Sequence, residues 1–152
     1  MILSHSQRKV VHFNITANQT AQQIVEAFPF DSAPRYLLHD RDSIYGKRFR
    51  IRVKSLGNEE VVTAPRSPWQ NLYVERIIGS IRRECLNQVV ILNERHLRQV
   101  LKCYASYYHE ARTHLSLDKQ SPVPRSIQQP DQGTVVAFPH VGGLHHEYGR
   151  AA

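Results

Sequence analysis

The stretch that decides the fold begins with Tyr36-Leu37-Leu38-His39-Asp40 and ends with Ser67-Pro68-Trp69-Gln70-Asn71-Leu72-Tyr73-Val74-Glu75-Arg76. The first run is apolar and ends in an acid, which predicts a short strand with Asp40 at its end. The second run predicts a proline-containing loop that leads into a long helix, with Glu75 in its first turn or so. Two carboxylates from distant elements are what a divalent-metal site for phosphoryl transfer requires.

Outward from this stretch, the sequence predicts strands that alternate with helices, which is typical of an α/β domain. Residues 1–3 have the pattern of a strand tail, and β-rich residues 8–15 predict the second arm of a hairpin. Further elements follow from apolar spacing and turn residues. They are a helix over about 19–28, a basic helix over 47–56 closed by Gly57, a strand over 60–63, and helices over about 70–88 and 93–110. Within the basic helix, Phe49, Leu56 and either Ile51 or Val53 are expected to face inward.

The C-terminal segment has a different composition. Pro122, Pro124 and Pro130 predict an extended tail, in which the apolar run Val135-Val136-Ala137-Phe138-Pro139 suggests a short strand that docks on this chain or another. The pair His145-His146 has no cysteine or acid at ligand spacing, so we do not expect a zinc site. The glycines at 133, 142 and 143 are too isolated to form a phosphate-binding loop.

The overall charge favours a polyanionic partner. The chain has 152 residues, a formal net charge of +7 and a pI near 9.7, and its basic excess lies between residues 35 and 112. An ordinary basic, solvated surface is the alternative. Cys85 and Cys103 predict free thiols in a reducing compartment. Neither a membrane span nor a signal peptide is evident, so a cytoplasmic location without membrane contact is expected.

The helix that carries Glu75 has two distinct faces. Helical spacing predicts burial of one set of residues, namely Val74, Ile77, Ile78, Ile81, Cys85 and Val89. The other face holds Glu75, then Gly79, then the arginine pair Arg82 and Arg83. An acid, a residue without a side chain and two arginines make an open surface that suits a phosphate backbone. A surface helix with ordinary charges is the alternative.

Two motifs resemble those of bacterial insertion-sequence transposases, within the superfamily of retroviral integrases and DDE transposases. His39-Asp40-Arg41-Asp42-Ser43-Ile44-Tyr45 is similar to the Ser-Asp-Arg-Gly-Ser-Gln-Tyr pattern around the second acid, and this register favours Asp40 over Asp42. The third-acid pattern Ser-Pro-x-x-Asn-x-Tyr-x-Glu-Arg matches Ser67, Pro68, Asn71, Tyr73, Glu75 and Arg76, at the family's usual gap. The run from Tyr107 to Leu117 resembles a shared tyrosine, arginine and histidine segment, and the resemblance covers about residues 8–125.

The resemblance implies an RNase H-like α/β fold that lacks its first strand, with C-terminal helices and an extended tail. It places residues 8–15 beside 35–39, a partial catalytic core over residues 1–125 and the tail over 126–152. Asp40 and Glu75 would be catalytic and metal-binding, and complete members use two Mg²⁺ or Mn²⁺ ions to cleave and join DNA strands. The residues expected to contact DNA are Lys47, Arg48, Arg66, Gln70, Asn71, Arg76, Arg82 and Arg83, with Arg50, Arg52 and Lys54 of the basic helix.

The chain departs from the family pattern in two places. Leu72 stands where a small residue or proline is common, and no residue matches the first acid of the family. Asp31 lies in an expected loop and Glu26 on an expected helix. The chain alone is therefore expected to be inactive in DNA cleavage. The alternatives are a non-catalytic DNA-binding remnant that joins homo-oligomers or a full-length transposase, and a purely structural or unfolded remnant.

Two groups of aromatic residues complete the expectations. Trp69, which follows Pro68, is expected to pack under its loop rather than to stack on a base. Tyr104, Tyr107 and Tyr108 share one helix and are expected to divide between core and rim.

Overall fold

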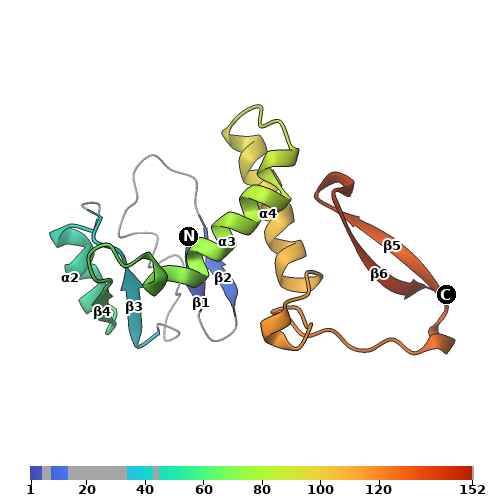
Figure 1. Cartoon of the computed structure of the whole chain (residues 1–152), viewed down its shortest axis with the longest axis horizontal. Helices are drawn as coiled ribbons and strands as arrows, with labels where there is room; N and C mark the ends of the chain where they lie inside the picture. Colours follow the sequence, from blue (N-terminus) through green and yellow to red (C-terminus); the bar gives the residue numbers. More distant parts are fainter. Residues whose placement is uncertain (5–7, 14–33, 43–44, 152) are drawn as a thin grey trace. The chain divides into compact units, whose positions relative to one another are not determined.

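The computed structural model describes residues 1–4, 8–13, 34–42 and 45–151, which form a mixed arrangement of helices and small sheets (Figure 1). The chain divides into two compact units. The first unit comprises Met1–His5 and Val10–Ile77, and the second comprises Ser6–Lys9 and Ile78–Ala152. The helix expected over about 19–28, together with Glu26 and Asp31, lies outside the described residues.

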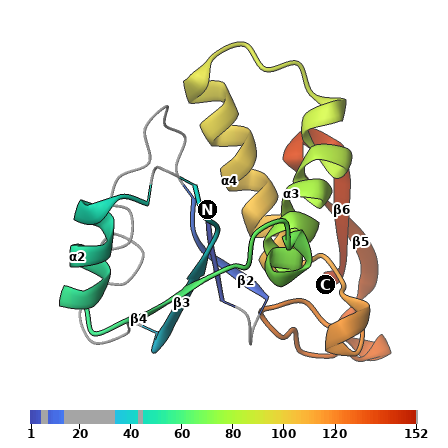
Figure 2. The same ribbon diagram turned by 60° about the vertical axis from the view of Figure 1, so that its left-hand side comes forward.

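In the first unit, the strand that leads to Asp40 and the next strand along the chain are joined by a helix. Strand β3 (Tyr36–His39) pairs in parallel with β4 (Glu59–Val62), from Tyr36 opposite Glu59 to His39 opposite Val62. Parallel strands need a crossover connection, and α2 (Lys47–Ser55) provides it. Figure 2 shows α2 on one side of this strand pair. The expected strand, basic helix and strand are therefore confirmed, with ends that shift by about a residue.

One expected strand pairing is wrong. Strand β1 (Ile2–Ser4) pairs with β2 (Lys9–His12), as the predicted hairpin requires. The pairing of residues 8–15 with 35–39 is not found, because β3 pairs with β4 in a separate two-stranded sheet over the described residues. A strand's apolar pattern shows that it is extended and leaves its partner open, since pairing depends on distant residues. The RNase H-like sheet order stays a prediction.

The core of the first unit forms beneath α2. Phe49 and Val53 are 8% and 0% exposed, and Ile2, Leu37, Tyr45 and Leu56 pack against them. Ile51 is 59% exposed, so Val53 takes the inward position that the sequence left open between the two. Positions 49, 53 and 56 lie one turn apart on a single face, whereas position 51 lies on the other side. Gly57, with φ of +75°, ends the helix in the left-handed conformation that glycine adopts without strain.

The helix expected over 70–88 is present in three pieces. A 3₁₀ turn, η1 (Pro68–Asn71), leads into α3 (Leu72–Glu84), and a second 3₁₀ turn, η2 (Leu86–Gln88), follows. Cys85, with φ −133° and ψ −68°, breaks the helical geometry between them. Ile77 and Cys85 are buried as expected, whereas Ile78 is 38% exposed, which corrects its place in the apolar face.

The second unit is built on α4 (Glu94–Glu110). Asn93 caps this helix, because its side-chain oxygen accepts a hydrogen bond of 2.8 Å from the His96 backbone N–H. Tyr104 and Tyr108 are buried and Tyr107 is half-buried, which confirms the expected division of the three tyrosines.

The C-terminal segment differs from the extended tail that the prolines predicted. After η3 (Leu115–Leu117) and η4 (Pro130–Gln132), strands β5 (Thr134–His140) and β6 (His145–Ala151) pair as an antiparallel hairpin. The turn η5 (Val141–Gly143) uses Gly142 and Gly143, both with positive φ. The apolar run at Val135 therefore docks on β6 of the same chain. The division into a core of 1–125 and a tail of 126–152 stays a prediction.

Candidate functional site

Asp40 follows the last residue of β3 and is exposed at the mouth of a pocket. Its Oδ1 accepts a hydrogen bond of 3.3 Å from the Asp42 backbone N–H. The pocket has a volume of about 360 Å³ and lies within the first unit. Its lining residues are His39, Asp40, Arg41, Asp42, Tyr45, Arg50 and Val62. The structure thus places the acid that the motif register favours where a strand end opens to solvent.

A buried histidine holds this strand end. His39 is 6% exposed, and its Nδ1 lies 2.6 Å from the Asp40 carbonyl oxygen, while its Nε2 lies 2.8 Å from Glu60 Oε1 on β4. Both partners are oxygen atoms, and the tautomer of the ring decides which of the two nitrogens donates. It also packs against the Tyr45 and Phe49 rings, at centroid distances of 4.4 and 5.2 Å. The backbone that carries Asp40 is therefore fixed by the sheet and by α2.

Two arginines line this pocket. Arg41 was not among the predicted site residues, and Arg50 was predicted only as part of a basic surface. Arg41 donates through Nε to the Thr63 carbonyl oxygen at 2.9 Å. Arg50 of α2 places its Nε 3.3 Å from Glu60 Oε1, the same oxygen that contacts His39. A basic residue beside a strand-end acid is visible in the sequence at Arg41. The position of Arg50 at the same pocket is not visible in the sequence, because it depends on how α2 packs.

The hydroxyl of Tyr45 reports the charge of the pocket. Burial raises its pKa, and the neighbouring carboxylates of Asp40 and Asp42 raise it further. Both carboxylates therefore act on the same point in the pocket, where a cation would relieve their repulsion. The choice between Asp40 and Asp42 as the catalytic acid stays a prediction that rests on the motif register.

Glu75 lies in the first turn of α3 and is exposed, with the buried Ile77 on the inward side of the same turn. This placement agrees with a ligand that faces solvent. The separation of the Glu75 and Asp40 carboxylates, expected at roughly 4–8 Å from metal–oxygen distances of about 2 Å, stays a prediction. Leu72, the departure from the family pattern, is 48% exposed at the start of the helix.

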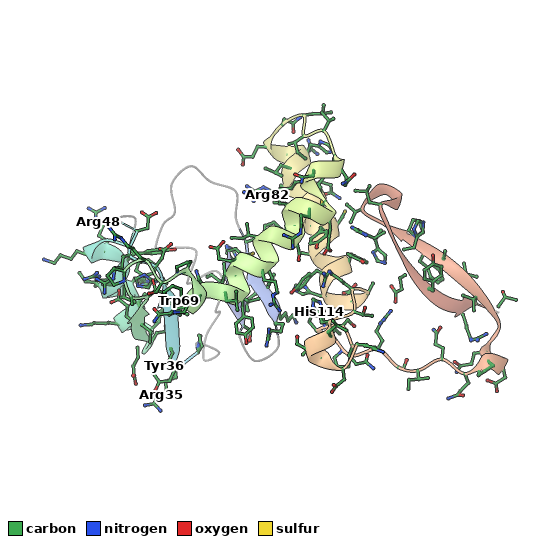
Figure 3. All side chains as sticks on the ribbon, viewed as in Figure 1. Arg35, Tyr36, Arg48, Trp69, Arg82 and His114 are labelled. Carbon is green, nitrogen blue, oxygen red and sulfur yellow. The ribbon has the colours of Figure 1, made fainter. Side chains whose placement is uncertain are left out.

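The loop before α3 presents an exposed tryptophan, so the expectation that Trp69 packs under the loop is wrong. Its side chain is 66% exposed (Figure 3). The loop itself is ordered by short contacts: Gln70 Oε1 accepts from the Ala64 backbone N–H at 2.6 Å, and the Gln70 N–H donates to the Ser67 carbonyl at 3.1 Å. These bonds fix the backbone and direct the indole outward.

Trp69 is the only tryptophan in the chain, so intrinsic fluorescence reports on this loop alone. Because the indole is exposed, we expect red-shifted emission and ready quenching by acrylamide in the folded protein. Unfolding in guanidinium chloride should change the acrylamide quenching constant by less than about twofold. A blue-shifted, quencher-resistant emission that becomes accessible only on unfolding would show a buried indole.

The residues predicted to contact DNA are exposed with one exception. Lys47 and Arg48 of α2, Arg66 and Gln70 of the loop, and Arg76, Arg82 and Arg83 of α3 are exposed, and Asn71 is half-buried. Arg48 and Arg82 are labelled in Figure 3. Gly79 gives room to Arg83, since a Cβ at this glycine would lie 3.0 Å from Arg83 Nη1. The guanidinium of Arg83 therefore lies back along α3 rather than reaching directly outward.

A hydrogen-bonded cluster in the second unit joins α3 to α4. Arg112 donates through Nε and Nη2 to both oxygens of Glu84, at 2.8 and 2.7 Å, and the Tyr104 hydroxyl donates to Glu84 Oε2 at 2.8 Å. His145 of β6 places Nε2 2.8 Å from the Glu84 carbonyl oxygen and stacks on Tyr107 at 4.3 Å. The sequence resemblance singled out the segment that holds Arg112 and gave Glu84 no role, and the structure pairs the two residues.

Titratable groups in this cluster are shifted from their ordinary values. Burial alone would raise the pKa of Glu84, but the hydrogen bonds from Arg112 and Tyr104 outweigh it and lower that pKa. Burial lowers the pKa of His109, and burial together with the Arg112 charge lowers the pKa of His114. The folded state therefore favours neutral histidines and an ionised Glu84.

These shifts predict that the second unit loses stability in acid. Below pH 6.5, the ordinary pKa of histidine, the unfolded chain binds more protons than the folded chain at positions 109 and 114. The free energy of unfolding therefore decreases as the pH decreases. Below the ordinary value of 4.5, Glu84 adds to the loss. Thermal melts followed by far-UV circular dichroism between pH 7.5 and 4 test this. Stability that stays level or rises as the pH falls from 7 to 5.5 would contradict it, and His109→Gln with His114→Gln should flatten this range.

Across the described ranges 1–4, 8–13, 34–42 and 45–151, no three His, Cys, Asp or Glu side chains gather into a set that could bind a metal ion. Among the helices in that same part of the chain, none has the length and apolar character needed to cross a membrane.

Comparison with known proteins gives two matches. A family model described as an integrase core domain matches residues 56–122, which include Glu75 and the Tyr107–Leu117 segment. The "Insertion element IS476 uncharacterized 39.2 kDa protein" of Xanthomonas euvesicatoria is 26% identical over 136 residues, which cover 89% of this chain and 39% of that protein. No solved structure gives a significant match. Residues 56–122 are therefore similar to the integrase core domain, and most of the chain is similar to a protein of a bacterial insertion element.

Proposed function

We propose that this chain is a DNA-binding part of an integrase core and that Asp40 and Glu75 serve a divalent-metal site for phosphodiester cleavage and strand transfer. The observation that carries the proposal is the position of Asp40. Asp40 follows the carboxyl end of a strand in a parallel pair and lines a pocket with two arginines. In the sequence it precedes the region that matches the integrase core domain, which contains Glu75. The chain spans 39% of its insertion-element relative, so the reaction of a whole transposase is part of the proposal.

The two acids fit the proposed ions in kind. Both offer exposed carboxylate oxygens, which are the hard ligands that Mg²⁺ and Mn²⁺ prefer. Bound there, such an ion would neutralise charge that develops on the scissile phosphate. His39 and Glu60 would keep the Asp40 backbone in place, and the sheet would hold it against α2.

DNA binding is the part of the proposal that needs only this chain. The exposed basic residues of α2, of the loop at Arg66 and of α3 supply cations for phosphate contacts. A non-catalytic DNA-binding protein, which joins oligomers of a full-length transposase, is the second candidate. The exposed basic residues support this candidate, because phosphate contacts need no metal site.

We expect the chain to bind duplex DNA with little sequence specificity and with strong salt dependence. The log–log slope of affinity against salt should be about −0.9 per phosphate contact. Changing Arg82 and Arg83 to alanine should make the slope shallower by the amount that about two phosphate contacts contribute. Fluorescence anisotropy with a labelled duplex between 50 and 200 mM NaCl measures both.

Arg35→Ala is a suitable control, because Arg35 is exposed and paired with Glu59 away from the predicted contacts. It should leave the slope unchanged. A salt response that is flat in the unaltered chain would refute DNA binding. An unchanged slope in the Arg82 and Arg83 variant would remove α3 from the DNA surface.

A further inference from the structure

The pocket at Asp40 carries both signs of charge, in an arrangement that the predicted carboxylate site does not use. Asp40 and Asp42 share its lining with Arg41 and Arg50. Arg41 bonds to the Thr63 carbonyl and Arg50 pairs with Glu60, so both guanidinium groups are held by residues outside the aspartate pair. A pocket that merely neutralised its own acids would direct its arginines at them.

In the described part of the chain, each guanidinium makes its contact through Nε. Arg41 forms a hydrogen bond, and Arg50, whose side chain is 58% exposed, forms an ion pair. Arg41 uses Nε toward Thr63, which is 7% exposed, and Arg50 uses Nε toward Glu60, whose side chain is 16% exposed. Nε anchoring fixes the plane of the group and leaves the paired Nη1 and Nη2 donors for another acceptor. That acceptor needs two or more oxygens, because the guanidinium fork matches phosphate and carboxylate oxygens.

Glu60 links the two sides of the pocket. Its Oε1 contacts both His39, which holds the Asp40 backbone, and Arg50 of α2. The position of the Arg50 charge is therefore coupled to the strand that carries Asp40. Arg50 is itself 58% exposed, so the ion pair with Glu60 restricts its motion only in part and removes part of the entropy cost of binding.

We propose that Arg41 and Arg50 are phosphate-positioning residues, which bind the non-bridging oxygens of a DNA phosphodiester next to a divalent cation on Asp40. The inference rests on the proposed function and adds a defined phosphate site to it. Without a cation, Asp40 and Asp42 repel the phosphate. A cation held by Asp40 would remove this repulsion, and the two guanidinium groups would then bind the phosphate oxygens, so phosphate binding in this pocket would depend on the metal.

Anisotropy with a fluorescein-labelled duplex, at fixed ionic strength in either Mn²⁺ or EDTA, tests the site. The measured quantity is the ratio of DNA affinity in Mn²⁺ to that in EDTA. We expect Mn²⁺ to raise the affinity of the unaltered chain by about tenfold, the effect of one charge-assisted hydrogen bond. Arg41→Gln combined with Arg50→Gln should reduce the ratio to about one. Arg41→Lys should lose most of it, because lysine lacks the fork.

Matched variants separate the outcomes. Arg48→Gln, on α2 but outside the pocket lining, should weaken binding in Mn²⁺ and EDTA alike and keep the ratio. Asp40→Asn should strengthen binding in EDTA and weaken it in Mn²⁺. A double variant of Arg41 and Arg50 that keeps the full ratio, or an unaltered chain without any Mn²⁺ gain, overturns the inference. A gain that survives Asp40→Asn overturns the proposed metal site itself. Circular dichroism of the variants, including Arg50→Lys, checks that losses of DNA affinity do not come from unfolding.

Discussion

Replacing Arg112 with alanine should lower the free energy of unfolding of the second unit by about 2–4 kcal/mol. Removing one partner of a buried ion pair costs about 3–5 kcal/mol, and this pair is partly screened because the two side chains are 25% and 28% exposed. The loss comes mainly from Glu84. Its carboxylate would keep only the Tyr104 hydroxyl as a side-chain donor while it remains half-buried.

Hydrogen exchange of the α4 amides in the full chain measures this effect, because α4 belongs to the same unit as the Arg112–Glu84 ion pair. Arg98→Ala is the matched control. Arg98 pairs with Glu94 one turn away on the surface of α4, and such pairs contribute about 0.2–0.5 kcal/mol. Arg112→Lys should fall between the two, since lysine keeps the charge and loses one of the two bonds. A loss under about 1 kcal/mol in Arg112→Ala would show that the pair adds little to stability.

The Glu84 cluster gives a physical role to the Tyr107–Leu117 segment. Arg112 and Tyr104 bind the last residue of α3, and Tyr107 stacks on His145 of the hairpin. The same helix that presents Glu75 in its first turn is thus fastened at its other end. Arg112 of this segment therefore holds the C-terminal end of the helix that carries Glu75.

Local features were predictable from the sequence because local physics determines them. The basic helix needed only the spacing of Phe49 and Leu56 and the terminating Gly57. The start of α4 needed only the capping side chain of Asn93. The position of Asp40 followed from an apolar run that ends in an acid. In each case the residues that decide the structure lie within about two helical turns.

Features that depend on distant residues were not predictable. Strand β6 has no alternation of apolar residues, and it pairs with β5 through its backbone. Gly149 leaves space for the ring of Phe138, whose Cε2 would lie 3.1 Å from an added Cβ, and no periodicity in the sequence signals this contact. The exposed Trp69 and the pairing of Glu84 with Arg112 likewise depend on tertiary packing. The predicted pairing of β2 with β3 was wrong for the same reason.

The 152-residue chain by itself is expected to show no Mg²⁺- or Mn²⁺-dependent DNA cleavage above background. Asp40 and Glu75 match the second and third acids of the family pattern that the sequence resembles, and no residue of the chain matches the first. A chimera that supplies a preceding strand with an aspartate should gain cleavage. In that chimera, Glu75→Gln and Asp40→Asn should each reduce the rate by at least about a hundredfold, the size of a lost electrostatic contact to a transition state. Nicking of a supercoiled plasmid measures the rate.

Two neighbouring acids make this test specific. Asp42→Asn removes a carboxylate from the same pocket, two residues from Asp40, and should change the chimera's rate by less than about tenfold if the register of the motif is right. Glu59→Gln removes an exposed glutamate that pairs with Arg35 and should have no effect. Nicking by the unaltered chain that is lost in Asp40→Asn would show that another of its residues completes the site. A larger loss from Asp42→Asn than from Asp40→Asn would transfer the catalytic assignment to Asp42, because both acids face the same pocket and differ only in which one holds the cation.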